Sequence, residues 1–190
     1  MKPPQSQLHC IPQIVYGIEI LDNALIEAAN PLLQKHWREI AHYPDIPLDV
    51  DWDGYMDLQN RECILFFTAR MKIDGSLAGY YVVITPPRNL HYKTSKQALN
   101  DVLFVDPDLR KFGIGLELID FGDRHLAGLG YQVIHQHVKA AHDFGPMLER
   151  RLGYELVDKI YARRLDRLAE RSVAGFAEVN DDRQNFDINS

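Results

Sequence analysis

Hydrophobic and polar positions along the chain follow two spacings, one typical of strands and one typical of helices. Runs of apolar, β-branched and aromatic residues predict six strands, over residues 13–21, 63–71, 76–85, 99–105, 131–138 and 154–165. Apolar residues at helical spacing predict helices over residues 22–41, 55–62, 113–127 and 143–153. The resulting order, β-α-α-β-β-β-α-β-α-β, predicts a mixed α/β domain around one sheet with antiparallel and parallel pairing.

Residues that break regular structure refine this prediction. Pro31 interrupts the helical pattern of residues 22–41, which predicts a kink or a division into two shorter helices. The Asp-Gly pair at 74–75 separates two strand-like runs and predicts a hairpin. Residues 166–190 are polar, so we expect a single domain over residues 1–165 followed by a partly disordered tail.

Charge and cysteine content narrow the classes of function. The 190 residues have a net charge of −6, which argues against a general nucleic-acid binder. Cys10 and Cys63 have no paired spacing, which excludes a disulfide framework and a CxxC zinc site and suits a reducing cytoplasm. No apolar run approaches the roughly 18 residues that cross a bilayer. We therefore expect a cytoplasmic protein without a membrane partner.

A glycine pair follows the strand predicted over residues 99–105. That strand ends at Asp106-Pro107, and Gly113 and Gly115 begin the next helix. The first turn of a helix has unpaired N–H groups, and glycines let a phosphate approach them closely. Two interpretations are open at this point: a phosphate-binding turn, or a turn between strand and helix that binds nothing.

Two motifs follow one another along the chain: Val105-Asp106-Pro107 with Arg110-x-x-Gly113-x-Gly115, and later "ERRLGYE". Together they resemble the signature of the GCN5-related N-acetyltransferases. The stretches "HYKTSKQALND" and "HVKAAHDFGPMLERRLGY" resemble members of this family that bacteriophage genomes carry. The resemblance covers roughly residues 13–165. It implies a sheet of about six to seven strands flanked by helices, in which a central parallel pair splays apart.

The resemblance also implies a binding site for acetyl-coenzyme A (acetyl-CoA) as co-substrate. Its pyrophosphate would bind backbone N–H groups of the glycine turn, at Lys111, Phe112, Gly113, Ile114 and Gly115, near the charge of Arg110. Its pantetheine arm would pair with the backbone of the strand before the turn, at Leu103, Phe104 and Val105. The thioester would lie where that strand splays from residues 131–138.

Transfer of an acetyl group to an amine requires a base, a donor to the oxyanion and, for the leaving thiolate, an acid. The family often places an Asn and a Tyr in the late short helix, where this sequence has His142 and Glu149. His142 is a candidate for catalysis, for a contact to pantetheine or for a helix cap. Glu149 is a candidate acid or a solvated helix residue.

For the base, the strand before the turn offers Asp101. Period-two alternation predicts that Asp101 shares a face with Leu99, Leu103 and Val105. The alternative is a strand-end salt bridge. His91 and Tyr92, on the preceding loop, are further candidates near the acceptor. His135 and His137 share a face of one strand, but no third ligand has the spacing of a metal site, so no metal is expected.

The acidic segment 49–60 nearly matches a calcium loop of the EF-hand type, except that Asn60 occupies the position of the bidentate Glu. An N-cap formed by Asp51 or Asp53 is the structural alternative. A third interpretation is an acceptor site for a cationic amine. Its substrate-binding residues would be Tyr43, Asp51, Trp52, Asp53 and Tyr92.

The sequence thus predicts an N-acetyltransferase that moves an acetyl group directly to a primary amine, such as a cationic small molecule or a protein lysine. Neither cysteine lies near the predicted thioester, so no covalent enzyme intermediate is expected. A longer acyl donor, a catalytically inactive binding module and a phage host-modifying acetyltransferase or toxin remain alternatives. A homodimer is also left open.

Overall fold

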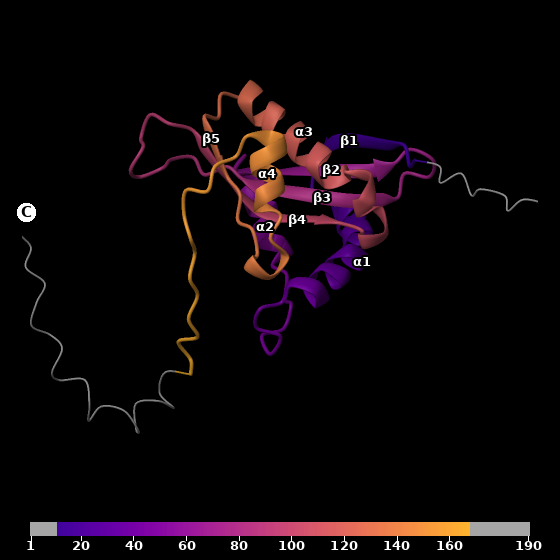
Figure 1. Ribbon diagram of the computed structural model, residues 1–190, viewed down its shortest axis with the longest axis horizontal. Helices are drawn as coiled ribbons and strands as arrows, with labels where there is room; N and C mark the ends of the chain where they lie inside the picture. Colours follow the sequence, from indigo (N-terminus) through magenta and orange to yellow (C-terminus); the bar gives the residue numbers. More distant parts are fainter. Residues whose placement is uncertain (1–10, 168–190) are drawn as a thin grey trace, which may run out of the picture. The chain divides into compact units, whose positions relative to one another are not determined.

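The computed structural model describes residues 11–167 (Figure 1). The chain divides into two units, Met1–Glu155 and Leu156–Ser190. All described helices and strands belong to the first unit. In chain order they are β1 (Ile14–Glu19), α1 (Asn23–Ile40), α2 (Trp52–Asn60), β2 (Ile64–Met71), β3 (Leu77–Ile84), β4 (Gln97–Val105), the 3-10 helix η1 (Pro107–Phe112), α3 (Ile114–Gly128), β5 (Val133–His135), the 3-10 helix η2 (Ala140–His142) and α4 (Gly145–Leu152).

The strands form one sheet in the order β1-β2-β3-β4-β5. The pairs β1–β2, β2–β3 and β3–β4 are antiparallel, whereas β4 and β5 are parallel over three residue pairs, from Gln97–Val133 to Leu99–His135. The hairpin predicted at residues 74–75 is confirmed between β2 and β3, and Gly75 has a φ of +71° there. Glycine adopts this backbone conformation without the strain that a Cβ causes.

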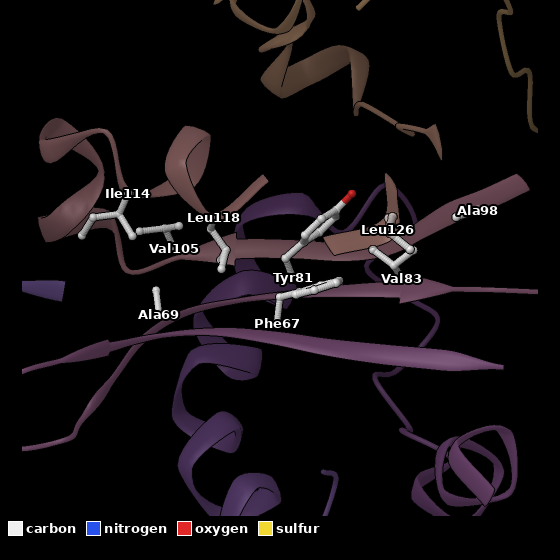
Figure 2. Close-up of a cluster of buried hydrophobic side chains, with 9 residues drawn as sticks. All are labelled: Phe67, Ala69, Tyr81, Val83, Ala98, Val105, Ile114, Leu118 and Leu126. Carbon is white, nitrogen blue, oxygen red and sulfur yellow. The ribbon is translucent and has the colours of Figure 1, made fainter. Parts of the chain in front are cut away.

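Helix α3 covers one face of the sheet, and α1 and α2 cover the other (Figure 1). Figure 2 shows the core between α3 and the sheet, where Phe67 and Tyr81 stack with ring centroids 5.7 Å apart. Gly122 of α3 passes directly over Tyr81, because a Cβ on Gly122 would lie 2.8 Å from the Tyr81 ring. The sheet is therefore buried on both faces, as the strand-like runs of β2 and β3 predict.

The first two helices begin at aspartate caps. The Asp22 side chain accepts a hydrogen bond from the N–H of Leu25 (2.8 Å). Helix α1 then continues through Pro31 as one helix, so of the two alternatives at Pro31 the division into two helices is wrong, and the kink stays a prediction. The predicted N-cap role of Asp51 is confirmed, since its carboxylate accepts from the N–H of Gly54 (2.8 Å). Because α2 begins at Trp52, three residues earlier than expected, most of segment 49–60 is helical and does not form an EF-hand loop.

Within residues 11–167 the sheet has five strands, not the six to seven expected. Residues 154–165 form no strand, and β5 has three residues where the sequence predicted eight. Within the described residues β5 is consequently the edge of the sheet, not a central strand. An apolar run makes a strand only where a neighbouring backbone pairs with it. Most large apolar side chains of this run are more than two-thirds exposed, namely Leu156, Val157, Ile160, Tyr161 and Leu165.

The predicted tail begins at residue 166, and all but its first two residues lie outside the described residues. The proposed domain boundary at residue 165 stays a prediction. Among residues 11–167, no helix has the length and apolar character to cross a membrane.

Candidate functional site

The glycine turn connects β4 to α3. Asp106 follows β4 and caps η1, accepting from the N–H of Asp108 (3.1 Å). Gly113 then adopts a φ of +78°, and α3 begins at the next residue. The N–H of Gly113 already donates to the carbonyl of Arg110 (3.1 Å). The first N–H groups of a helix have no partner inside it, so the turn presents those of Ile114 and Gly115 at the positive end of the α3 dipole.

Gly115 has no evident structural reason to be glycine. It lies in the first turn of α3 without a positive φ, and a Cβ there would make an ordinary contact of 3.6 Å with Val105. A helical glycine lowers stability by roughly 0.5–1 kcal/mol relative to alanine. The fold would therefore accept a larger residue at position 115.

Arg110 ties the turn to α1. Its Nε donates to the carbonyl of Val105 (3.0 Å), and its two Nη atoms donate to the two carboxylate oxygens of Glu39 (both 2.7 Å). The guanidinium also lies 5.1 Å from the ring centre of Phe104. The charge of Arg110, expected near a phosphate, is thus paired with Glu39, which the sequence analysis missed. This ion pair lowers the pKa of Glu39.

His142 joins the same cluster. Its Nε2 lies 3.0 Å from the backbone carbonyl of Glu39, so the residue borders the end of α1 from η2. Of the other candidates, Lys111 is exposed in the last turn of η1, and Glu149 is exposed on α4. The structure therefore brings His142 close to Arg110 through Glu39, but it does not bring Glu149 into this cluster by any described contact.

Beyond Leu99 and His135 the strands β4 and β5 part. The backbone pairing between the two strands ends there. At the next position the Asn100 side chain, in place of a β4 backbone carbonyl, accepts a hydrogen bond from the N–H of His137 (2.5 Å). Asn100 is buried, at 4% exposure. A lone Asn within an apolar strand was a signal that the sequence analysis did not use. Leu103, Phe104 and Val105 follow on the part of β4 that has no β5 partner.

Asp101 lies at a β-bulge of β4. Val82 pairs with Val102 and Val83 pairs with Asn100, so Asp101 has no partner on β3. A bulge shifts the alternation by one residue and redirects a side chain. Asp101 is exposed, and its Oδ2 accepts a hydrogen bond from the Tyr55 hydroxyl of α2.

The expected face of Asp101 is therefore partly wrong. Leu103 and Val105 pack in the core under α3, whereas the partner of Asp101, Tyr55, packs in the core under α1 and α2. The paired residue of Leu99, Ile84, belongs to this second core as well. Asp101 thus shares a face with Leu99 but not with Leu103 or Val105, because the bulge resets the period after Asp101.

The acidic segment lines a hollow of about 510 Å³, formed by Asp49, Val50, Asp51, Trp52 and Asp53. Trp52 lies next to Tyr55 in space, with ring centroids 5.9 Å apart. Of the other acceptor candidates, Tyr43 packs edge-on against His42 in the loop after α1. His91 and Tyr92 are exposed, and both backbone N–H groups donate to the Asn89 side chain.

A buried polar network lies between α3 and the segments that follow β5 and α4. The Tyr154 hydroxyl donates to Asp123 (2.8 Å), and Gln136 donates to the hydroxyls of Tyr154 and Tyr81. Asp123 Oδ1 and Gln136 Oε1 are buried without a hydrogen-bond partner. Burial raises the pKa of Asp123 to about 6. Tyr154 begins the run predicted as a strand over residues 154–165, and nothing in the sequence pattern indicated this network.

Within residues 11–167, no group of three or more His, Cys, Asp or Glu side chains could hold a metal ion. His135 lies 3.4 Å from the Gln97 side chain. Cys63 is a free, buried thiol that donates to the carbonyl of Arg61, while Cys10 lies outside the described residues.

Residues 26–154 match the model of the acetyltransferase (GNAT) family. The match spans both the glycine turn and the late helix that carried the resemblance in the sequence. The chain therefore belongs to the GNAT family, and its fold is the α/β GNAT fold with a five-stranded mixed sheet. A sequence search of curated proteins found no match.

Solved structures share this fold at low sequence identity. An acetyltransferase from Trypanosoma brucei superposes with a TM-score of 0.62 at 17% identity, over 80% of this chain and 100% of that one. An aminoglycoside acetyltransferase from an uncultured soil metagenomic sample, solved with sisomicin, gives 0.61 at 15% identity, over 80% and 96% of the two chains. A protein from Clostridium acetobutylicum described as a predicted acetyltransferase, solved with acetyl-CoA, gives a TM-score of 0.60 at 12% identity, over 80% of this chain and 97% of that one.

Proposed function

We propose that this protein is an N-acetyltransferase that moves the acetyl group of acetyl-CoA to a primary amine by direct attack. The observation that carries the proposal is the glycine turn at the carboxyl end of β4, on the strand that parts from β5. Family membership supports the reaction class. Likeness to a bacteriophage subset stays a prediction.

On the cofactor side, the N–H groups of Ile114 and Gly115 hold the pyrophosphate, and Lys111 and Phe112 border it. Gly115 supports this role, because its lack of a Cβ serves no evident packing need and instead allows a phosphate to approach the backbone. The pantetheine arm pairs with the β4 backbone at Leu103, Phe104 and Val105, which have no β5 partner. The solved neighbour that contains acetyl-CoA supports this choice of co-substrate.

On the acceptor side, a cationic amine approaches from the face covered by α1 and α2. The bulge puts Asp101 on the same side as Tyr55, whose neighbour Trp52 lines the acidic hollow with Asp51 and Asp53. Negative charge in a concave surface attracts a cation. The neighbour solved with sisomicin, an aminoglycoside acetyltransferase, is consistent with a cationic acceptor. Tyr43, His91 and Tyr92 remain candidates for the rim of this site.

The reaction takes place where the proposed cofactor site and acceptor site meet. The reacting nitrogen attacks in its neutral form: its lone pair adds to the thioester carbonyl carbon, and the C=O π electrons move to oxygen. The tetrahedral species then collapses, the C–S bond breaks, and its electron pair leaves with sulfur. Asp101 takes the proton that the nitrogen must lose. Because Glu149 lies on α4 outside the cluster of Arg110, Glu39 and His142, and His142 borders α1, we assign neither as the acid, and the thiolate takes its proton from water.

Calorimetric titration of acetyl-CoA, with desulfo-CoA as control, tests the proposal on the wild type and on Gly115→Asp. We expect binding by the wild type and its loss in the variant, because a carboxylate would repel the pyrophosphate. Release of free thiol in the presence of an amine panel then tests turnover. Binding without turnover of any amine would indicate a catalytically inactive module, and absence of binding would overturn the proposal.

A further inference from the structure

One hydrogen bond joins helix α2 to strand β4 in the proposed acceptor region. The Tyr55 hydroxyl, on α2, donates to Oδ2 of Asp101, 46 residues later on β4. Asp101 sits at the bulge, where no β3 residue pairs with it. An exposed carboxylate at such a position would otherwise rotate among several rotamers.

The Tyr55 ring is itself held in place. It packs against Phe66 of β2, with ring centroids 6.0 Å apart, and against Trp52, at 5.9 Å. The start of α2 is fixed by the Asp51 cap, which accepts from the N–H of Gly54, the residue just before Tyr55. The Asp51 cap and the two ring contacts therefore fix the position of the Tyr55 hydroxyl beside the bulge.

The hydroxyl also remains a donor. Burial raises the pKa of Tyr55 well above its ordinary value, and the hydrogen bond to Asp101 acts in the same direction. Tyr55 therefore keeps its proton throughout the neutral range. Within residues 11–167, the Asp101 side chain makes this one hydrogen bond, so Oδ2 is occupied and Oδ1 has no protein donor.

We propose that Tyr55 is a positioning residue for the acetyl transfer, an inference that rests on the function proposed above. By holding Oδ2, Tyr55 fixes the plane of the Asp101 carboxylate and leaves Oδ1 to take the proton. In that step the amine nitrogen forms its bond to the acetyl carbon, its N–H bond breaks, and the proton moves to Oδ1. Tyr55 transfers nothing. A preoriented base is effective because little reorganisation remains at the moment of reaction.

A double-mutant cycle with Tyr55→Phe and Asp101→Asn tests the inference in the full-length protein, using the amine that the wild type acetylates best. We expect Tyr55→Phe to lower kcat about tenfold, with the dissociation constant for CoA unchanged. Asp101→Asn should lower kcat by roughly 10²–10⁴-fold, the usual range for a general base. If Tyr55 acts through Asp101, the double variant should be no slower than Asp101→Asn alone.

Tyr16→Phe is the matched control. Tyr16 also donates to a carboxylate, Glu117 (2.7 Å), but from β1. We expect Tyr16→Phe to leave kcat unchanged. Thermal unfolding of each variant shows whether it is folded. A wild-type kcat in Tyr55→Phe, or effects that multiply in the double variant, would overturn the inference while the proposed function stands. If the wild type binds CoA but acetylates no amine, both are overturned.

Discussion

Arg110 and Glu39, 71 residues apart, are joined by two parallel hydrogen bonds of 2.7 Å. This bidentate pair connects the turn after β4 to the last helical turns of α1. Because Arg110 also donates to the carbonyl of Val105, one side chain spans the strand end, the glycine turn and the helix. Bidentate pairs of this kind add geometric specificity to their energy.

Glu39→Gln should lower the free energy of unfolding at pH 7 by about 1 kcal/mol or less, since the pair is partly exposed. The pair lowers the pKa of Glu39 below its ordinary 4.5. Its stabilisation is therefore complete above pH 4.5 and is lost as the pH falls through the lowered pKa. Urea unfolding at pH 7 and pH 3 measures this. Asp57→Asn, which removes the exposed pair with Arg61, is the control and should have little effect at either pH.

Two glycines of α3 should respond to alanine in opposite directions. Gly115→Ala should raise stability by roughly 0.5–1 kcal/mol, because its Cβ finds ordinary contact distance, yet weaken binding of CoA. Gly122→Ala should lower stability by about 1–3 kcal/mol, because its Cβ would lie 2.8 Å from the fully buried Tyr81 ring. Chemical denaturation measures the stability of both variants, and calorimetric titration measures the CoA affinity of Gly115→Ala. Unchanged CoA affinity in Gly115→Ala would contradict the phosphate-binding role proposed for that residue.

Asp123→Asn should stabilise the protein at neutral pH. Burial raises the pKa of Asp123 from 3.8 to about 6, so the ionised carboxylate opposes folding at pH 7. That cost disappears as the pH falls from about 6 toward 3.8, where folded and unfolded chains both bind the proton. We expect a gain of at most about 3 kcal/mol at pH 7 and little at pH 4. A gain that does not change with pH would show that ionisation of Asp123 is not its cause.

Asn100→Leu should loosen the point at which β4 and β5 part. Leucine has a similar size but offers no acceptor to the N–H of His137, so the loss of this hydrogen bond should cost about 1 kcal/mol. We expect faster hydrogen exchange at the amides of residues 134–137 and weaker CoA binding. Exchange in β2 and β3 should be unchanged and serves as the internal control. Equal protection at residue 137 would contradict the role of Asn100.

Local signals in the sequence were sufficient for most of the fold. Alternation and apolar runs predicted β2 and β3 closely, and the Asp-Gly pair predicted their hairpin, because a turn depends on the conformations of its own few residues. The Asp51 cap is similarly local, since its partner is three residues away. The glycine turn and the family resemblance also came from neighbouring residues, and the family match confirms membership of the GNAT family.

The tertiary structure decided what depends on distant partners. The run at 154–165 is as apolar as a strand, but pattern alone does not supply a neighbouring backbone to pair with. The bulge at Asp101 is a property of the β3–β4 register, so alternation predicted its face only in part. The pairs Tyr55–Asp101 and Arg110–Glu39 join residues 46 and 71 positions apart. Sequence by itself therefore determined most of the elements and the place of the glycine turn, whereas packing between elements decided which side chains meet, because such contacts arise only when the chain closes on itself.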